Sequence, residues 1–262
     1  MDVARAGQSC ATSRAAALGD LAPVSVRRGE GWVAVRTSAA SNDLNVVLGE
    51  PGFVPDADLL GTLLRWLGEV PASWQVRAPD AALSRALTAA GWTPERTGRW
   101  CGRELAPVGA APGEVVVSPV ADAGDLEDWL DVAQACDWLE DTHDRGVRRA
   151  LAEALEGEPR HRAWVARLGE RPVGMATGWY AAPCVEVVDV AVLEDVRRRG
   201  VGGALVGAVL AWGAAWGARE VVAAPSPEGW RLFESLGFDN VPAEPDVCFY
   251  APDGRPRTST SA

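Results

Sequence analysis

Lysine is absent from this sequence of 262 residues, and all 25 basic residues are arginine. The absence excludes chemistry that needs a lysine amine, such as Schiff-base formation. It also excludes a phosphate-binding loop of the Walker type, which requires a lysine. Acidic residues number 36, and the formal net charge is -11. General attraction to nucleic acid or to an anionic membrane surface is therefore not expected.

Cysteine is sparse, and no two cysteines form a C-x-x-C motif. The five are Cys10, Cys101, Cys136, Cys184 and Cys248. Their odd number and wide spacing argue against a metal site or a disulfide framework, and a reducing compartment fits best. The N-terminus has no apolar signal-peptide core, and no run approaches the roughly 20 apolar residues that span a bilayer. We expect a cytoplasmic protein without metal, membrane or nucleic-acid partners.

With 262 residues, the chain is long enough for one large domain or two small ones. Since 48% of its residues are hydrophobic, each domain can form a core. A Pro-, Gly- and Ala-rich stretch separates two better-patterned regions, as is typical of a linker. We predict an α/β (α+β) protein with domains at 1–105 and 114–251 and a linker at 106–113. The tail at 252–262 has too few apolar residues to fold.

The segment RRRGVGGAL, residues 197–205, follows a strand-like run at 184–193 and precedes an apolar helix pattern. The helix that begins there leaves its first N–H groups without intrahelical partners, and the glycines allow close approach of a ligand. With the helix dipole and the arginines, these groups favour a diphosphate. A helix start with a solvated charge run is the simpler alternative. A dinucleotide fold is disfavoured because Leu205 stands where G-x-G-x-x-G needs glycine.

Hydrophobic periodicity after the linker predicts strands alternating with helices. Strands are expected at 114–120, 163–169, 172–181, 185–193 and 219–224, and helices after Asp122, after the loop 136–145, at 201–217, and from Ser226 to Gly237. The strands 163–169 and 172–181 are expected to pair as an antiparallel hairpin.

The N-terminal part echoes the second half of this order. It has a strand at 43–49, a helix at 56–69, a strand at 73–79 and a helix at 80–90. It then ends in Gly91-Trp92, and the later copy ends in Gly237-Phe238, which indicates an internal duplication. In the first copy the glycine turn reads GEPGFVP, with Glu50 in place of the arginines and two prolines that lack N–H donors. That copy is not expected to bind a diphosphate.

The motif Arg197-x-x-Gly200-x-Gly202, after a strand ending in Ala191-Val192, resembles the acyl-CoA binding motif of GCN5-related N-acetyltransferases (GNATs). The resemblance covers roughly residues 113–251, with the element order β-α-α-β-β-β-α-β-α-β. It implies the GNAT acyltransferase fold, a mixed and mostly antiparallel sheet with a V-shaped split between two parallel strands. Residues 1–105 resemble a smaller, degenerate half of the same fold, as in tandem acetyltransferases with one working domain. That half is expected to pack as a covalent stand-in for a dimer mate.

This resemblance implies acetyl-CoA as the cofactor. The backbone near Val192 would hold the pantetheine arm and stabilise the developing oxyanion, and the arginine turn would hold the diphosphate. Ser226 stands where the family frequently has an asparagine, and Phe233 where it often has a tyrosine that protonates the leaving thiolate. The residues expected to bind the cofactor are Ala191, Val192, Leu193, Arg197, Arg198, Arg199, Gly200, Val201, Gly202, Gly203, Ser226 and Phe233.

A carboxylate near the acetyl carbon is expected to take the proton of the attacking amine. Glu186 matches the position of the base in the histone-acetylating branch of the family, and it is our first candidate; a carboxylate on the wet face of a strand is the alternative. Asp189 is the second candidate, and strand alternation predicts that it points to the opposite face. Because phenylalanine at 233 cannot serve as the acid, either Tyr180 or solvent does so, or the reaction tolerates the absence of an acid, since a CoA thiolate is already a reasonable leaving group.

The loop 136–145 lies between the first two helices, where this family shapes its acceptor site. Trp138, Glu140 and Asp141 are candidates to clamp a cationic amine, and His143 is a candidate base or substrate contact. A simple acidic surface loop is the alternative. The acidic loop favours a polyamine-like or aminosugar acceptor.

Together these features predict an acyl-CoA-dependent N-acetyltransferase that acts on a primary amine of a small molecule or peptide by direct attack. Two alternatives stay open. One is a non-catalytic acyl-CoA-binding or scaffold protein, and the other is a tandem enzyme similar to mycothiol synthase. The protein is expected to be a monomer or a homodimer.

Overall fold

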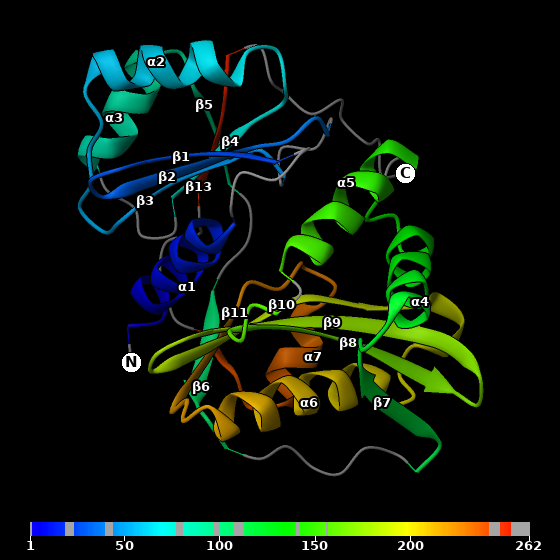
Figure 1. The fold of residues 1–262 in the computed structure, drawn as a ribbon. Coiled ribbons are helices and arrows are strands. Elements are labelled where there is room, and N and C mark those ends of the chain that lie inside the picture. Colours follow the sequence, from blue (N-terminus) through cyan, green and yellow to red (C-terminus); the bar gives the residue numbers. More distant parts are fainter. Residues whose placement is uncertain are drawn as a thin grey trace.

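The computed structural model describes residues 2–18, 24–39, 44–76, 81–96, 100–106, 113–139, 142–155, 157–240 and 247–252. Within these ranges the chain forms two mixed β-sheets, with helices α1 (Val3–Ala17) and α5 (Thr142–Ala154) between them (Figure 1). The predicted mixed α/β class is confirmed. No helix in the described part of the chain is long and apolar enough to cross a bilayer.

The larger sheet has seven strands in the order β12-β6-β11-β10-β9-β8-β7. They are β6 (Cys101–Glu104), β7 (Val115–Pro119), β8 (His161–Leu168), β9 (Arg171–Ala181), β10 (Cys184–Val192), β11 (Glu220–Ala223) and β12 (Asp239–Asn240). Only β10 and β11 pair in parallel, and the other neighbours are antiparallel. The predicted hairpin of β8 and β9 is confirmed.

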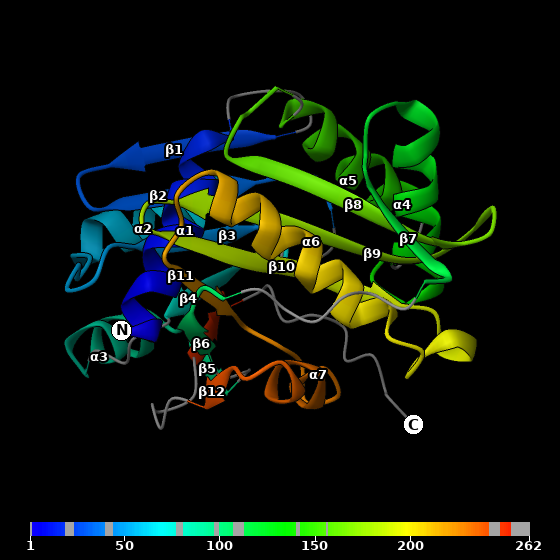
Figure 2. The same cartoon turned by 90° about the horizontal axis from the view of Figure 1, so that it is seen from below.

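Helix α6 (Val201–Ala215) crosses the outer face of this sheet, on the side away from the smaller sheet (Figure 2). It lies close to the strands because β9 carries glycines beneath it. A Cβ added at Gly174 would lie 2.9 Å from Leu205, and one added at Gly178 would lie 2.9 Å from Val209. The opposite face is covered by α4 (Ala123–Ala135), α1 and α5.

The smaller sheet has six strands in the order β1-β2-β3-β4-β13-β5. They are β1 (Ser25–Gly29), β2 (Trp32–Arg36), β3 (Val46–Gly49), β4 (Ser73–Val76), β5 (Thr93–Arg96) and β13 (Val247–Tyr250). Helices α2 (Ala57–Leu67) and α3 (Ala81–Ala89) cover its outer face, and β3 and β4 form its parallel pair. The strand order and the place of the parallel pair repeat those of the larger sheet, as the predicted internal duplication requires.

The two halves exchange their last strands. Strand β6 comes before the predicted linker, but it lies in the larger sheet between β11 and β12. Strand β13 comes from the C-terminal end and lies in the smaller sheet between β4 and β5. Each sheet is therefore completed by a strand from the other half. The predicted boundary at 106–113 stays a prediction, since residues 107–112 lie outside the described residues, as does the tail from 253 onwards.

The last helix is shorter than predicted. It was expected to begin after Ser226, but α7 spans Trp230–Ser235 and begins after Gly229. Ser226 still forms a local turn, because its hydroxyl accepts a hydrogen bond from the N–H of Gly229 at 3.1 Å. Pro227 therefore lies in the turn before the helix and not in its first position.

Candidate active site

The two parallel strands of the larger sheet separate after four paired positions. Cys184 to Val187 of β10 pair with Glu220 to Ala223 of β11. From Val188 to Val192, β10 continues with β9 on one side and, within the described residues, no ladder partner on the other. We call this gap the β10–β11 opening. It is the V-shaped split that the GNAT resemblance implies.

One backbone amide can be assigned to the β10–β11 opening. The N–H of Leu193 donates to the carbonyl of Val173, next to β9, at 3.0 Å. Successive residues of a strand direct their N–H groups to opposite sides, so the N–H of Val192 faces the opening. The carbonyl of Val192 accepts from Nε of Arg197 at 3.1 Å. The side chain of Ala191 is buried against α4, on the face of the sheet that this helix covers.

Helix α6 begins beside this opening without a side-chain cap. Its N-cap residue is Gly200, in the left-handed conformation with φ 84°, and no cap hydrogen bond is made within the described residues. The first intrahelical bond runs from Ala204 N–H to the carbonyl of Gly200 at 2.9 Å. Arg198 also has a positive φ, 63°. Backbone of this shape directs consecutive N–H groups towards one point, as in anion-binding nests.

The three arginines of the motif are exposed, but they do not act alike. Arg197 contacts the end of β10, as described above. Arg199 pairs with Glu114 at 3.2 Å, next to β7. Arg198 has no ion pair in the described part of the chain, so it is the arginine of the motif that remains available to an anion.

Two of the motif glycines have different surroundings. A Cβ added at Gly202 would lie 2.9 Å from Cδ2 of Leu232, whereas the nearest atom to one at Gly203 is 3.9 Å away, in Leu236. Contact between α6 and α7 is therefore sufficient to explain Gly202. Close approach of a ligand remains an expectation for both.

Phe233 lies in the core of the second half. Its side chain is 4% exposed and stands edge-on to Phe238, with ring centroids 5.0 Å apart. A ring packed in this way has no polar atom to offer a leaving group. The hydroxyl oxygen of Ser226 accepts a hydrogen bond from the N–H of Gly229, so within the described residues its hydrogen remains available to donate to a ligand.

A cavity of about 850 Å³ lies between the two halves, and its lining extends to Trp212, Ala215 and Trp216 at the C-terminal end of α6. We call it the central cavity. Its apolar walls include Leu44 and Leu48 from the first half and Trp129 and Leu151 from the second. Its half-buried ionisable lining residues include Arg14, Arg148, His161 and Asp189.

The candidate base Glu186 does not line this cavity. It is 3% exposed and lies behind Arg14 of α1, whose Nη2 is 3.5 Å from its Oε1. Its second oxygen, Oε2, is buried and has no hydrogen-bond partner within the described residues. The wet-face alternative for Glu186 is therefore wrong, because the first half covers this part of β10.

Asp189, the second candidate, does line the central cavity. It stands at a register shift of β10 between Val188 and Ala191 and has a positive φ of 47°. Its Oδ2 is 3.8 Å from Nη1 of Arg148 on α5. The prediction that Asp189 and Glu186 point to opposite faces is wrong, because the bulge interrupts the strict alternation of side chains.

His161 was not among the sequence candidates. It starts β8, pairs across the ladder with Trp179, and lines the central cavity. Burial, followed by the charge of Arg14, lowers the pKa of His161 to about 4. Its ring is therefore neutral at neutral pH and able to donate and accept hydrogen bonds.

The other sequence candidates that the structure describes do not line this cavity. Tyr180 packs against Trp216, a lining residue, with ring centroids 5.8 Å apart, but is not itself part of the lining. Trp138 is 38% exposed, and His143 contacts the carbonyl of Ser38 in the first half at 3.0 Å. Neither lines the central cavity. Glu140 and Asp141 lie outside the described residues.

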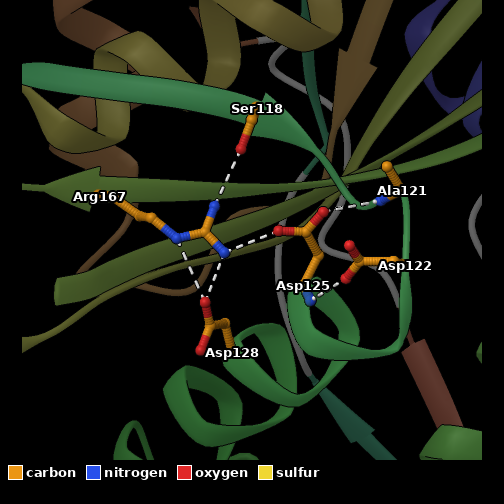
Figure 3. Close-up of polar contacts among 6 residues, drawn as sticks. All are labelled: Ser118, Ala121, Asp122, Asp125, Asp128 and Arg167. Carbon is orange, nitrogen blue, oxygen red and sulfur yellow. Dashed lines mark hydrogen bonds and ion pairs between the residues drawn. The ribbon is translucent and has the colours of Figure 1, made fainter. Parts of the chain in front are cut away.

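An ionic cluster fixes the start of α4, which forms one wall of the cavity (Figure 3). Arg167 of β8 donates to Asp125 at 2.8 Å and to Ser118 at 3.0 Å, and it also pairs with Asp128. Desolvation acts to raise the pKa of Asp125, but the hydrogen bonds from Ala121 N–H and Arg167 outweigh it and lower that pKa. The charged side chains of this cluster thus pair with one another and stabilise the contact between β8 and α4.

The corresponding position in the first half is closed to an anion. Helix α2 is capped by Asp56, whose carboxylate accepts from the N–H of Leu59 at 2.8 Å. Phe53 lies against Gly49, at the end of β3, and stacks on Trp74 of β4 with centroids 6.5 Å apart. We expect this half not to bind a diphosphate. The aspartate cap of α2 and the position of Phe53 between Gly49 and Trp74 agree with that expectation.

Comparisons with known proteins agree with this architecture. Residues 125–238 match the model of the acetyltransferase (GNAT) family. The comparison with curated proteins gives no match. Among solved structures, a GCN5-related N-acetyltransferase from Kribbella flavida is similar over 95% of both chains, with 17% identity and a TM-score of 0.64.

Two further structures also match nearly the whole chain. A tandem GNAT protein from the clavulanic acid biosynthesis pathway covers 97% of this chain and 96% of its own, with 16% identity and a TM-score of 0.57. A putative GNAT-family acetyltransferase from Novosphingobium aromaticivorans covers 94% of this chain and 95% of its own, with 19% identity and a TM-score of 0.57. The chain therefore has the tandem GNAT fold, and residues 125–238 of its second half match the acetyltransferase (GNAT) family model.

Proposed function

We propose that this protein transfers the acetyl group of acetyl-CoA to a primary amine of a small molecule or peptide by direct attack. The match of residues 125–238 to an acetyltransferase family model supports acetyl transfer in general. The observation that carries the finer proposal is the β10–β11 opening beside the uncapped start of α6.

The residues present fit an acyl-CoA at this opening. Acetyl-CoA, when bound, would supply the acetyl group as an activated thioester. The first N–H groups of α6, from Val201 to Gly203, lack side-chain caps in the described part of the chain and favour a diphosphate, with Arg198 available beside them. The unpaired edge of β10 offers hydrogen bonds to the pantetheine amides. The N–H of Val192 stabilises the developing oxyanion, an effect of about 3 kcal/mol.

The acceptor amine occupies the central cavity. Asp189 is the candidate base that borders this space, so it takes the proton of the attacking amine. Glu186 acts through Arg14 and not by contact, because Arg14 lies between it and the cavity. Solvent protonates the leaving thiolate, since Tyr180 does not line the cavity and Phe233 has no proton to give.

Cofactor binding is tested at the start of α6 by calorimetry with coenzyme A. The variant Gly200→Asp places in the second half the carboxylate cap that α2 already has, and Gly200→Asn is the matched neutral control. Aspartate and asparagine both tolerate the left-handed backbone of this position. We expect the aspartate variant to bind at least about 10-fold more weakly than the asparagine variant, because its charge opposes the diphosphate. Equal affinities would contradict this location.

Catalysis is tested by incubating the protein with acetyl-CoA and a library of amines and recording free thiol. We expect release with some amine, reduced by about 100-fold or more in Asp189→Asn, with coenzyme A binding retained. Binding without release from any amine would favour the non-catalytic acyl-CoA-binding alternative.

A further inference from the structure

The central cavity contains guanidinium groups that the protein uses only in part. Arg14 of α1 and Arg148 of α5 both line it, with side chains 29% and 20% exposed. Their distances to Glu186 and Asp189, 3.5 and 3.8 Å, are those of ion pairs, and no hydrogen bond is made by either arginine within the described residues. Each guanidinium carries five N–H donors, so donors remain available on both.

The two ion pairs differ in what they present to the cavity. Glu186 lies behind Arg14, so this pair shows the cavity a positive group held by a buried carboxylate. Asp189 and Arg148 both border the cavity, so the second pair shows it both signs. The cavity thus offers Arg14 as an anion receptor and Asp189 as a cation receptor, between apolar walls.

The other charged residues that line the cavity are Asp122, Glu153, Glu158 and Arg162. Asp122 caps α4 through the N–H of Asp125, and Glu158 is paired with Arg160 at 2.8 Å. Glu153 and Arg162 are exposed at the rim.

We propose that the acceptor is an amine that also carries a carboxylate, such as an amino acid with an apolar side chain. Arg14 binds the carboxylate, Asp189 receives the ammonium group, and the apolar walls take the side chain. Arg14 and Arg148 carry two positive charges, and their partners Glu186 and Asp189 carry two negative ones, so the two ion pairs sum to zero and a zwitterion leaves that sum unchanged. A polyamine, which the acidic loop favoured on sequence grounds, would instead bring several positive charges against two guanidinium groups. This inference rests on the proposed acetyl transfer.

The test compares matched acceptors that differ only in the carboxylate. L-leucine, L-phenylalanine and L-tryptophan are assayed with acetyl-CoA against their carboxamides and against isoamylamine, phenethylamine and tryptamine. We expect kcat/KM to be about 10- to 100-fold higher for the acids than for the amides and amines, as for loss of a charge-assisted hydrogen bond. Equal or better use of acceptors without a carboxylate would overturn the inference.

Variants of Arg14 and Glu186 distinguish a carboxylate-binding role of Arg14 from a structural one. Arg14→Gln should raise KM for the acids by about 10- to 100-fold, leave kcat within a few-fold, and leave the amines unaffected. Arg14→Lys should restore part of the loss, and Glu186→Gln should resemble Arg14→Gln because it frees the guanidinium. Equal loss for acids and amines in Arg14→Gln, with unchanged thermal unfolding, would refute the assignment.

A binding measurement keeps this inference distinct from the catalytic proposal. The acids and amines are titrated calorimetrically into the protein saturated with coenzyme A. Acids that bind to the wild type and not to Arg14→Gln support the carboxylate site even if no amine releases thiol. If the amino acids do not bind while coenzyme A does, this inference is overturned and the proposed acetyl transfer is not. Should Arg14→Gln fail to fold, Arg14→Lys is measured in the same way, and we expect it to bind the acids more weakly than the wild type does and the amines equally well.

Discussion

Asp189 combines a strained backbone with a useful position. A positive φ is uncommon for residues other than glycine, although aspartate tolerates it better than most. Here the bulge that produces it turns the carboxylate into the central cavity, towards Arg148. Strain of this kind concentrates at functional sites, where surrounding structure maintains it. The backbone therefore supports the choice of Asp189 over Glu186 as the contacting base.

The neutral His161 gives the protein a measurable response to acid. Its pKa is about 4 in the folded state, against an ordinary value of 6.5. As pH falls from about 6.5 towards 4, the unfolded chain binds this proton and the folded chain does not, so stability falls. The loss reaches up to about 3 kcal/mol at the low end of this window. Denaturant unfolding of wild type and His161→Gln between pH 7 and 4.5 should show a flatter slope for the variant. Parallel slopes would contradict the effect of burial on this ring.

At the scale of elements, α6 depends on small residues where it meets the sheet. A Cβ added at Gly213 would lie 2.8 Å from Cγ1 and 2.9 Å from Cβ of Val185. A valine branch close to the backbone cannot move aside as the end of a long side chain can. The position of α6, and with it the proposed diphosphate-binding start of this helix, is therefore set by close packing on β10.

Two alanine substitutions test this packing. Gly213→Ala should reduce the free energy of unfolding by about 1–3 kcal/mol, because the methyl group overfills the contact. Gly146→Ala, in α5, has no atom within 4 Å of the added Cβ and should raise it by about 0.5–1 kcal/mol. Denaturant titration of both proteins measures the difference. A stabilising Gly213→Ala would show that α6 can move away from the sheet.

Sequence reasoning succeeded where one element carries its own pattern. The apolar periodicity of α6 and of β8 to β10 predicted those elements closely, and the uncapped glycine turn was found from local chemistry alone. Helix α1 was missed because its buried residues are mostly small, such as Cys10, Ala11 and Ala15, and form no strong apolar stripe. The bulge at Asp189 was missed because nothing local marks it.

The cavity residues could not be found from the sequence for a different reason. Arg14, Arg148 and His161 lie far apart in the chain and meet only through tertiary packing. Each belongs to a stretch without a motif, so no spacing rule applies to it. The acidic loop attracted attention through composition, but Trp138 and His143 lie elsewhere in the fold.

At the scale of the whole molecule, the halves are joined by more than a linker. Strand β6 fills the gap between β11 and β12, and β13 fills the one between β4 and β5. Helix α1 packs against both sheets and covers Cys184 and Val222 of the second half. Neither half alone has a complete sheet.

Separation of the halves tests this interdependence. A fragment of residues 110–262 lacks β6 and α1, so it exposes two strand edges and an apolar face, and we expect it to aggregate. Co-expression with residues 1–109 as a second chain should restore a soluble complex, since the exchanged strands need no covalent link. Light scattering and size-exclusion chromatography measure both states. A monodisperse, active fragment 110–262 would contradict the expectation.

The reciprocal strands also constrain how this chain can change over time. The first half has an aspartate cap and a half-buried phenylalanine at its glycine turn, and neither favours an anion there. It cannot freely lose Cys101 to Glu104, because these residues form the neighbour of β11, one arm of the β10–β11 opening. A half that is not expected to bind a diphosphate thus still contributes a strand beside the proposed cofactor site.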